Sequence, residues 1–511
     1  MHMKHSLFIL AVMSLLFLGS CASDDSLSEL TPEPKPETPT IPFTGTISFG
    51  DNPSAVIQAA MADPSPRFKA LSDEEVKVAA TWEVGDELAL VIDGTVTKAT
   101  VSEVKDGKAY ISARVVSTVS DGADARFIYP YTAVDQNTGQ VKENLLAEQD
   151  GTLETIAKQF DVCEGSGKLS VYGGAAVVQE DITMLEKFSI MRFETRLASD
   201  KSPLNITRMY IEQGDDTYTV SLASAAYQQI YVVIKPQTQT LTVRGLPDPE
   251  GVAYIKSAQN ANIQAQKFYR STLYMTIDEM WFIFPNTYYQ WDAKEWCFYG
   301  EANYPKEFGT PMTGYNYISV QNYDPDDVRC FSTATGDSTT TLGSNAVAQY
   351  SAKDMPCANA LTWYIMAGNP YIDYTTVYYL GGKKCTGGIW LKKWNKIAGK
   401  PAGSTITSCA EPHPQYVWPS AANNGRATVY CNNYGVPANT DDYFFLPYLS
   451  NYWRARFNYQ QAAYWTSSSL ISTRGIIFSC QTDGLTLSSG VDNKEAGAVS
   501  GHRHDGSAWF K

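Results

Sequence analysis

Charged residues are scarce in this chain, and histidines are scarcer still. Asp, Glu, Lys and Arg make up 18% of the 511 residues, and there are five His. Lys plus Arg number 40 against 54 Asp plus Glu, which gives a net charge of −14. This shortage of positive charge argues against nucleic acid or an anionic membrane surface as the main partner. Hydrophobic residues, at 44%, suffice for a packed core, and the length predicts about three domains.

Long apolar runs are also missing, apart from one at the N-terminus. Leu7–Leu18 is too short to span a bilayer as a mature helix and fits the apolar region of a secretory signal peptide. Leu18–Cys21 resembles the lipobox of bacterial lipoproteins, which implies cleavage before Cys21 and diacylation of its thiol. Ser23–Asp25 resembles the acidic surface-export signal of lipoproteins in gut and oral Gram-negative anaerobes. An ordinary signal peptide with a coincidental Cys is the alternative.

The segment after this run has little to bury. Its prolines alternate with Glu, Lys and Thr, and they are Pro32, Pro34, Pro36, Pro39 and Pro42. Such a composition favours an extended polyproline II conformation. We therefore expect residues 1–20 to be a lipoprotein signal peptide and residues 21–42 to be a tether that lifts the folded part off a lipid surface.

Motifs for catalysis or metal binding are absent as well. The first half contains no nucleotide-binding loop, no G-x-S-x-G and no metal constellation, and the nine Cys include no C-x-x-C. Only His413, His502 and His504 lie outside the signal peptide. We expect no enzyme activity, no metal and no cofactor. For most of the eight Cys after Cys21 we expect an apolar or partly paired role.

What the first half does contain is short alternating segments that predict β-strands. Ile41–Phe49 alternates apolar and small or polar residues with a period of two. Further strand-like runs are separated by Gly, Asp and Ser turn signals, at 88–92, 95–101, 109–116, 126–129, 204–211, 217–222, 229–234 and 240–243. This pattern predicts a mainly β fold built from β-sandwiches.

Three segments of the first half resemble a known family. Thr81–Leu88 looks like the W-x-x-G-D-x-hydrophobic element of fimbrillin-like proteins, the subunits of type V pili. Phe127–Tyr131 looks like their Y-P strand end, and Phe188–Leu197 resembles the strand that opens their second sandwich. The resemblance covers roughly residues 41–270 and implies two tandem transthyretin-like β-sandwiches, at 43–160 and 161–272. A generic two-sandwich surface lipoprotein is the alternative.

The resemblance also implies a mechanism of assembly. In this family the first strand is removed by proteolysis after an Arg in the following loop, and the groove then accepts a strand from a neighbouring subunit. Ile41–Phe49 has the alternation of such a strand. Arg67 is the only Arg before Arg114 and is therefore the candidate cleavage site. A solvated Arg that begins the next strand is the alternative.

Tryptophan is nearly absent from the first half of the chain and frequent in the second half. Ten of the 11 Trp lie after residue 280. Met355–Gly368 predicts a helix, with Pro356 in its first turn and Gly368 at its end. Short segments at 387–393, 441–447, 464–469 and 475–478 are separated by Gly and Asn turns. Residues 273–511 therefore read as a loop-rich α+β domain.

This second half resembles the lectin-like module that is often fused to fimbrillin-like domains, similar to the C-type-lectin/formylglycine-enzyme superfamily. The matching elements are Asn359–Tyr364, Phe444–Pro447 and Tyr464–Ser468, within about residues 346–511. Gly497–Arg503 matches the usual chain end only loosely. The resemblance implies a C-type-lectin-like fold.

Binding in this module is predicted to be metal-free. Calcium needs about six to eight oxygen ligands, and Glu411–His413 and Trp394–Lys396 each miss a key oxygen of calcium-dependent sugar sites. No Cys spacing matches the paired catalytic Cys of formylglycine enzymes. Aromatic residues in polar, turn-rich segments are instead the candidates for ligand binding, namely Trp394, Tyr416, Trp418, Tyr452 and Trp453. For each of them, a place in the fold core is the alternative.

The two resemblances together imply a pilus (fimbria) tip adhesin at the cell surface. It would be made as an outer membrane lipoprotein precursor and found mature in fimbriae. Other pilin subunits would be its partners by donor-strand exchange, and its C-terminal domain would bind a glycan or protein ligand on a host or microbial surface. It would contact the membrane only through its lipid anchor. It would not bind nucleic acid. A non-polymerising surface glycan-binding lipoprotein and an enzyme of the lectin-like region are the alternatives.

Overall fold

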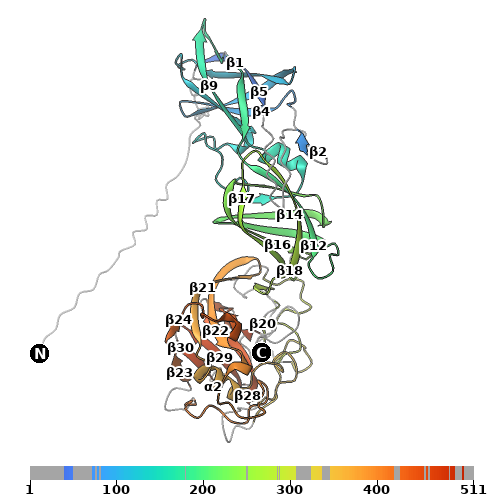
Figure 1. Cartoon of the computed structure of the whole chain (residues 1–511), viewed down its shortest axis with the longest axis vertical. Helices are drawn as coiled ribbons and strands as arrows, with labels where there is room; N and C mark the ends of the chain where they lie inside the picture. Colours follow the sequence, from blue (N-terminus) through green and yellow to red (C-terminus); the bar gives the residue numbers. More distant parts are fainter. Residues whose placement is uncertain are drawn as a thin grey trace, which may run out of the picture.

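The structure is a computed structural model in which three β-rich parts follow one another along the long axis in chain order (Figure 1). It describes residues 39–49, 72–74, 77–79, 82–178, 180–248, 251–284, 286, 288–305, 324–336, 346–418, 426–449, 451–453, 456–458, 461–472, 474–482, 484–488 and 498–499. Cys21 and Arg67 lie outside these residues. The described chain is mainly β, which confirms that part of the sequence prediction.

The first part is an eight-stranded sheet with the strand order β10-β1-β11-β9-β7-β4-β5-β6. Its strands are β1 (Thr40–Phe49), β4 (Glu87–Ile92), β5 (Thr95–Lys105), β6 (Lys108–Val116), β7 (Asp124–Tyr129), β9 (Cys163–Tyr172), β10 (Ala175–Val178) and β11 (Ile182–Glu186). Every strand predicted from alternation in this part falls within an observed one. Because β1 begins at Thr40, the tether expected over 21–42 overlaps the fold by three residues.

The second part is another eight-stranded sheet, in the order β15-β12-β18-β17-β16-β13-β14-β8. Its strands are β8 (Glu148–Gln149), β12 (Ser189–Leu197), β13 (Ile206–Gln213), β14 (Asp216–Ala226), β15 (Ile230–Ile234), β16 (Gln237–Leu246), β17 (Tyr254–Ile263) and β18 (Phe268–Ile277). Between β8 and β9 lie the helical turns α1 (Leu153–Thr155) and η2 (Ile156–Phe160), and η1 (Tyr131–Ala133) follows β7.

The two sheets do not divide at residue 160/161, where the sequence analysis placed the boundary. β9 pairs along its length with β7 of the first sheet, from Tyr129 opposite Cys163 to Asp124 opposite Lys168. β8, which precedes the expected boundary, pairs instead with β14 of the second sheet. Local composition marked a turn-rich segment there, but strand pairing decides which sheet a strand joins. The second sheet's continuous run of strands begins at Ser189.

The C-terminal part holds two further sheets and one helix. The five-stranded sheet contains β19 (Trp281–Phe282), β21 (Tyr371–Leu380), β22 (Lys383–Lys392), β24 (Asn433–Tyr434) and β25 (Tyr443–Pro447). The six-stranded sheet contains β20 (Tyr288–Tyr289), β23 (Arg426–Tyr430), β28 (Gln461–Ile471), β29 (Arg474–Gln481), β30 (Gly484–Ser488) and β31 (Ala498–Val499). Short elements complete the description: β2 (Ser72–Glu74) with β3 (Lys77–Ala79), β26 (Asn451–Trp453) with β27 (Arg456–Asn458), η4 (Trp394–Lys396) and η6 (Thr440–Asp442).

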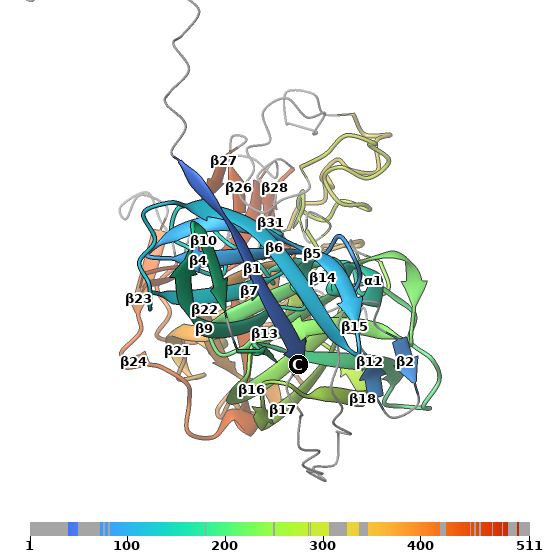
Figure 2. The same ribbon diagram turned by 90° about the horizontal axis from the view of Figure 1, so that it is seen from above.

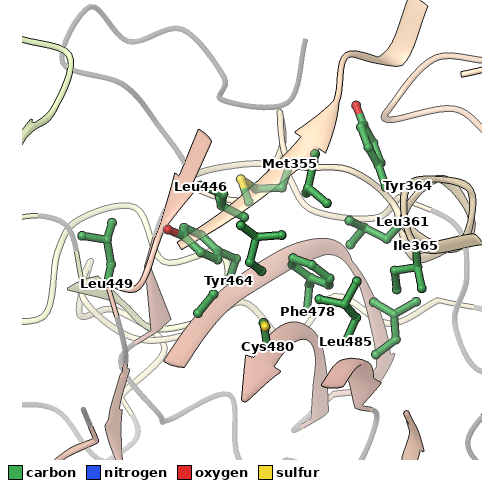
Figure 3. Packing of buried hydrophobic residues seen from close by; sticks show 14 of the residues in the cluster. Met355, Leu361, Tyr364, Ile365, Leu446, Leu449, Tyr464, Phe478, Cys480 and Leu485 are labelled. Atoms are coloured by element: carbon green, nitrogen blue, oxygen red, sulfur yellow. The ribbon is translucent and has the colours of Figure 1, made fainter. Parts of the chain in front are cut away.

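The helix α2 (Ala358–Met366) lies inside the predicted range but is shorter, because Cys357 before it is extended. All but its last residue are buried. Leu361 and Ile365 pack with Tyr464, Phe478 and other residues of the six-stranded sheet in one large apolar core (Figure 3). One α-helix thus packs on the β-sheets of this part, and the C-type-lectin-like fold expected here stays a prediction.

No disulfide joins the eight cysteines that the structure describes. Seven of them are buried, among them Cys357, Cys409, Cys431 and Cys480 in the large core. Burial raises the pKa of Cys297 to about 12 and that of Cys409 to about 11, so both are protonated thiols at neutral pH. The apolar role expected for most cysteines agrees with these positions. Among the described residues, no helix is long and apolar enough to cross a bilayer.

A buried ionic cluster joins the second sheet to the C-terminal part. Arg244 of β16 is bound by Asp278 (Nε to Oδ2, 2.7 Å) and by Glu212 of β13 (Nη1 to Oε2, 2.5 Å). The Tyr379 hydroxyl of β21 donates a hydrogen bond to Glu212. Burial acts to raise the pKa of Glu212, but the hydrogen bonds from Tyr379 and Arg244 outweigh it and lower this pKa. Trp281 stacks on the Tyr379 ring at 5.4 Å. These contacts fix one part against the next.

Candidate functional site

The strand β1 completes the first sheet by pairing on both sides. On one side Thr40 to Ile47 lie antiparallel to β6, opposite Val116 to Ala109. On the other side β1 runs parallel to β10 at Phe43 and Thr44, and parallel to β11 from Ile47 to Phe49. Figure 2 shows β1 lying beside β6 across this end of the molecule. Among the described strands, β1 is thus the piece that closes the sheet between β6 and the pair β10 and β11.

The side chains of β1 alternate between the core and solvent. Phe43 and Ile47 are 1% and 0% exposed, whereas Pro42 and Thr44 are exposed. Between the two large apolar residues stands Gly45, also buried. A Cβ added to Gly45 would lie 3.3 Å from Cζ of Phe43, so the Phe43 ring covers the space that a side chain at position 45 needs. The inward face of β1 therefore reads large, small, large.

The strands of the first sheet form the walls that receive these residues. The Phe43 ring lies 6.0 Å from the ring of Phe127 on β7. Ile47 lies opposite Ile182 of β11 and belongs to the same apolar core, which also holds Ile111 of β6. An empty groove here would expose this apolar lining to water, and burying a Phe or Ile side chain stabilises by about 1.5–3 kcal/mol.

Polar contacts hold the two ends of β1. Near its start, Arg114 Nε donates to Thr40 Oγ1 at 3.0 Å and the Ser117 amide donates to the Pro39 carbonyl at 2.8 Å. Near its end, Lys108 of β6 forms an ion pair with Asp181, the residue before β11. Because β6 and β11 are the two neighbours of β1 at this point, the Lys108–Asp181 pair spans β1. It is half-exposed, and Asp181 raises the pKa of Lys108.

The aromatic residues predicted to bind ligand lie in different environments. Trp394 is 9% exposed, its Nε1 donates to the Ser404 carbonyl at 3.1 Å, and its ring lies 5.4 Å from Tyr364. Tyr416 is 6% exposed, and its ring meets Trp418 edge-on at 5.3 Å. All three belong to or pack against the large core, which is the alternative that the sequence left open.

Tyr452 and Trp453 are neighbours in β26, where Tyr452 lies opposite Phe457 and Trp453 opposite Arg456 of β27. Their side chains lie outside the described residues. The structure therefore does not bring the five predicted aromatics together into one described site, and ligand binding by them stays a prediction.

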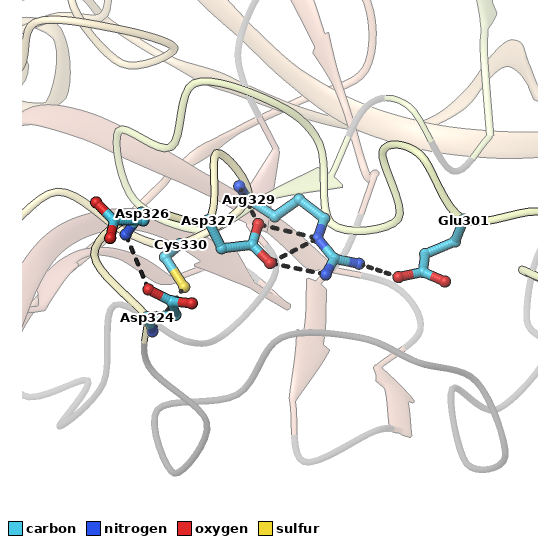
Figure 4. Close-up of polar contacts among 6 residues, drawn as sticks. All are labelled: Glu301, Asp324, Asp326, Asp327, Arg329 and Cys330. Atoms are coloured by element: carbon cyan, nitrogen blue, oxygen red, sulfur yellow. Dashed lines mark hydrogen bonds and ion pairs between the residues drawn. The ribbon is translucent and has the colours of Figure 1, made fainter.

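An acidic stretch before the C-terminal core is partly paired with one arginine. Arg329 binds both carboxylate oxygens of Asp327 and, through Nη1, Glu301 at 2.6 Å (Figure 4). Arg329 lowers the pKa of Asp327 below its ordinary value. The Asp326 amide donates to Asp324 Oδ1 at 3.0 Å, which closes a tight turn. In the described part of the chain, no three His, Cys, Asp or Glu side chains are grouped so as to hold a metal ion.

Comparison with known proteins finds structural neighbours among solved structures. The chain matches no protein-family model and no curated protein. A fimbrial assembly protein from Parabacteroides distasonis is 8% identical, with 47% of this chain and 99% of that chain covered at a TM-score of 0.25. A fimbrial protein from Bacteroides ovatus is 11% identical, with 86% of this chain and 96% of that chain covered at a TM-score of 0.22. A candidate cell adhesion protein from Bacteroides uniformis is 13% identical, with 44% of this chain and 99% of that chain covered at a TM-score of 0.26.

Proposed function

We propose that this chain is a cell-surface pilus subunit whose strand β1 is exchanged for a strand of a neighbouring subunit. The observation that carries the proposal is the position of β1 between β6 and the pair β10 and β11, with large, small and large side chains pointing inward. Main-chain ladder bonds supply affinity in such strand addition, and pockets for alternate side chains supply specificity.

The groove under β1 suits an incoming strand because it offers both sources of binding. The antiparallel register of β1 with β6 runs over eight consecutive residues, so a donor gains a long ladder. The two pockets now filled by Phe43 and Ile47 are deeply buried, as is Gly45 between them, while Thr44 is exposed. A donor must therefore carry a large apolar residue, a small residue and a second large apolar residue at alternate positions.

The C-terminal part favours a place at the tip of the pilus. Its last described strand, β31, is built into the six-stranded sheet, antiparallel to β20 and parallel to β28. To serve as a donor strand for another subunit, β31 would first have to leave this sheet. The ionic cluster around Arg244 fixes this part against the second sheet, so a ligand bound at its surface would be coupled to the assembly end. We propose that the C-terminal part is the adhesive end.

Export completes the proposal. Lipidation at Cys21 would carry the precursor to the outer membrane, and cleavage after Arg67 would free the chain from its anchor together with β1. Both residues lie outside the described part of the chain, so they rest on the sequence resemblance.

N-terminal sequencing of protein purified from the cell surface tests the proposal. A start at Phe68 in material that co-purifies with fimbriae is the expected result, and Arg67→Ala should abolish both. A lipidated start at Cys21 with no fimbrial association would instead support the non-polymerising glycan-binding lipoprotein.

A further inference from the structure

Three tyrosines stand exposed at one corner of the C-terminal part. Tyr374 of β21 is 51% exposed, Tyr430 of β23 is 67% exposed and Tyr434 of β24 is 56% exposed. Most of the aromatic residues around them are buried in the large core, such as Tyr364, Tyr378 and Tyr464. Exposed aromatic side chains that gather in one place mark interaction sites more often than singly scattered ones do.

Two of these tyrosines border the same turn. The Tyr374 hydroxyl donates a hydrogen bond at 3.1 Å to the carbonyl of Thr482, in the turn between β29 and β30. Tyr430 lies opposite Gly484, the first residue of β30. Tyr374 and Tyr430 therefore meet this turn from two different strands.

The third tyrosine lies on the other side of Tyr374. Tyr434 pairs with Ile372 of β21, two residues before Tyr374, and the Gly435 amide donates to the Ile372 carbonyl at 2.8 Å. Figures 1 and 2 both place β21, β23 and β24 on the same side of the C-terminal part. We name Tyr374, Tyr430 and Tyr434 the tyrosine corner.

Within the tyrosine corner, Tyr374 is held in place and a side-chain amide lies beside Tyr434. Tyr374 is fixed by its hydrogen bond to Thr482 and by the buried Tyr448, whose ring lies 6.5 Å away. Beside Tyr434, the Asn433 side-chain amide donates to Asn369 Oδ1 at 2.8 Å and to the Pro370 carbonyl at 3.1 Å. A fixed ring loses little conformational entropy when a ligand stacks on it.

The segments that form the corner carry acidic but no basic residues. Residues 369–376, 428–436 and 479–488 contain no Lys or Arg and two acidic residues, Asp373 and Asp483. The Asp373 carboxylate is buried and accepts hydrogen bonds from Thr375, Thr376 and Trp390. On a chain with a net charge of −14, a surface without Lys or Arg disfavours an anionic ligand.

We propose that the tyrosine corner binds a neutral carbohydrate. The aliphatic face of a sugar ring packs on an aromatic face, and its hydroxyls pair with the tyrosine hydroxyls, amides and carbonyls at the rim. Protein interfaces are enriched in Arg as well as Tyr. The strands that carry the three tyrosines contain a single Arg, Arg426 at the start of β23. This inference rests on the adhesive role proposed above. It adds the class of ligand that the C-terminal part binds and the residues that bind it.

The test uses the full chain on a printed array of neutral oligosaccharides that end in hexose, N-acetylhexosamine or fucose, with sialylated and sulfated oligosaccharides as a second arm. We expect binding in the neutral arm. Tyr430→Ala and Tyr434→Ala should each weaken it about three- to tenfold, the loss expected for one aromatic contact. Tyr434→Phe, which keeps the ring, should retain most of the binding. The matched control is Tyr172→Ala, which removes an 89% exposed tyrosine of β9 in the first sheet and should change nothing.

The inference is overturned if no neutral oligosaccharide is bound, if only acidic ones are, or if the alanine variants bind as the parent does. Incorporation into fimbriae is measured on the same proteins. Loss of glycan binding with normal incorporation separates the corner from assembly, and absence of incorporation with intact glycan binding refutes the pilus proposal alone.

Discussion

Phe43 and Gly45 share one inward site on β1. A Cβ at position 45 would approach Cζ of Phe43 to 3.3 Å and Cγ1 of Ile111 to 3.7 Å. The ring of Phe43 lies so close to position 45 that a side chain there would require the ring to shift by a few tenths of an ångström. The groove therefore selects a strand with this pattern, because it requires both a large residue at position 43 and a residue without a side chain at position 45.

Removing the larger partner should loosen the strand. Phe43→Ala deletes a buried aromatic side chain, and such truncations cost about 3–5 kcal/mol. Native-state hydrogen exchange of the β1 and β6 amides should report a loss of this size in their opening free energy. Thr44→Ala, at the exposed neighbouring position, is the control and should stay within about 0.5 kcal/mol. Equal effects of the two variants would mean that the pockets contribute little.

Filling the gap should also weaken the strand. Gly45→Leu introduces a side chain where the Phe43 ring lies, and overpacking of this kind costs about 1–3 kcal/mol. Thr44→Leu adds the same side chain on the outer face and serves as the matched control. The same hydrogen-exchange measurement checks both. If Gly45→Leu were as stable as its parent, the small residue would not be part of the recognition pattern.

The Lys108–Asp181 pair should slow the release of β1, because it spans this strand between β6 and β11. Lys108→Gln should speed exchange of the β1 amides at low salt, and the difference should shrink in 1 M salt, where the screening length is about 3 Å. Lys98→Gln removes the pair with Glu87 (3.0 Å), which is equally exposed but lies on β4 and β5. This control should leave β1 exchange unchanged. A salt-independent effect of Lys108→Gln would contradict the explanation.

Asp373 should make the C-terminal part sensitive to acid. Burial acts to raise the pKa of Asp373, but hydrogen bonds from Thr376, Trp390 and Thr375 outweigh it and lower this pKa to about 2. A lowered pKa in the folded state means that the ionised form stabilises the fold above the unfolded value of about 4, and that this contribution is lost as the pH falls through about 2. The melting temperature of the parent should therefore drop more steeply than that of Asp373→Asn between pH 4 and pH 2. Parallel curves would show that Asp373 has no such role.

Much of the first half could be predicted from local sequence. Alternation in Ile41–Phe49 and in the run at 109–116 has a period of two because one face of each strand is buried, and that period is visible without a structure. The run at 88–92 is apolar throughout, and all five of its residues are buried. The helix at 358–366 was also visible, since its apolar face and its flanking Pro and Gly are local signals.

Contacts between distant residues could not be predicted in the same way. The hydrogen bond between Tyr379 and Glu212 joins residues far apart in the chain, and the sequence around neither residue predicts it. The membership of β9 in the first sheet likewise depends on its partner β7. Exposure was the hardest property to predict: Trp394 stands in a polar, turn-rich segment but is buried, whereas Tyr430 of β23 is exposed.

The most direct test of the account replaces β1 itself. A site-specific protease sequence placed between residues 50 and 71 lets the full chain be cut while β1 stays bound. A labelled peptide with the sequence of residues 40–49 is then added, beside a peptide with Leu at the position of Gly45 and a scrambled one. The account predicts that the first peptide displaces β1 and restores the melting temperature of the uncut protein, while the other two do not. Failure of the matched peptide to enter the groove, or entry of all three alike, would contradict it.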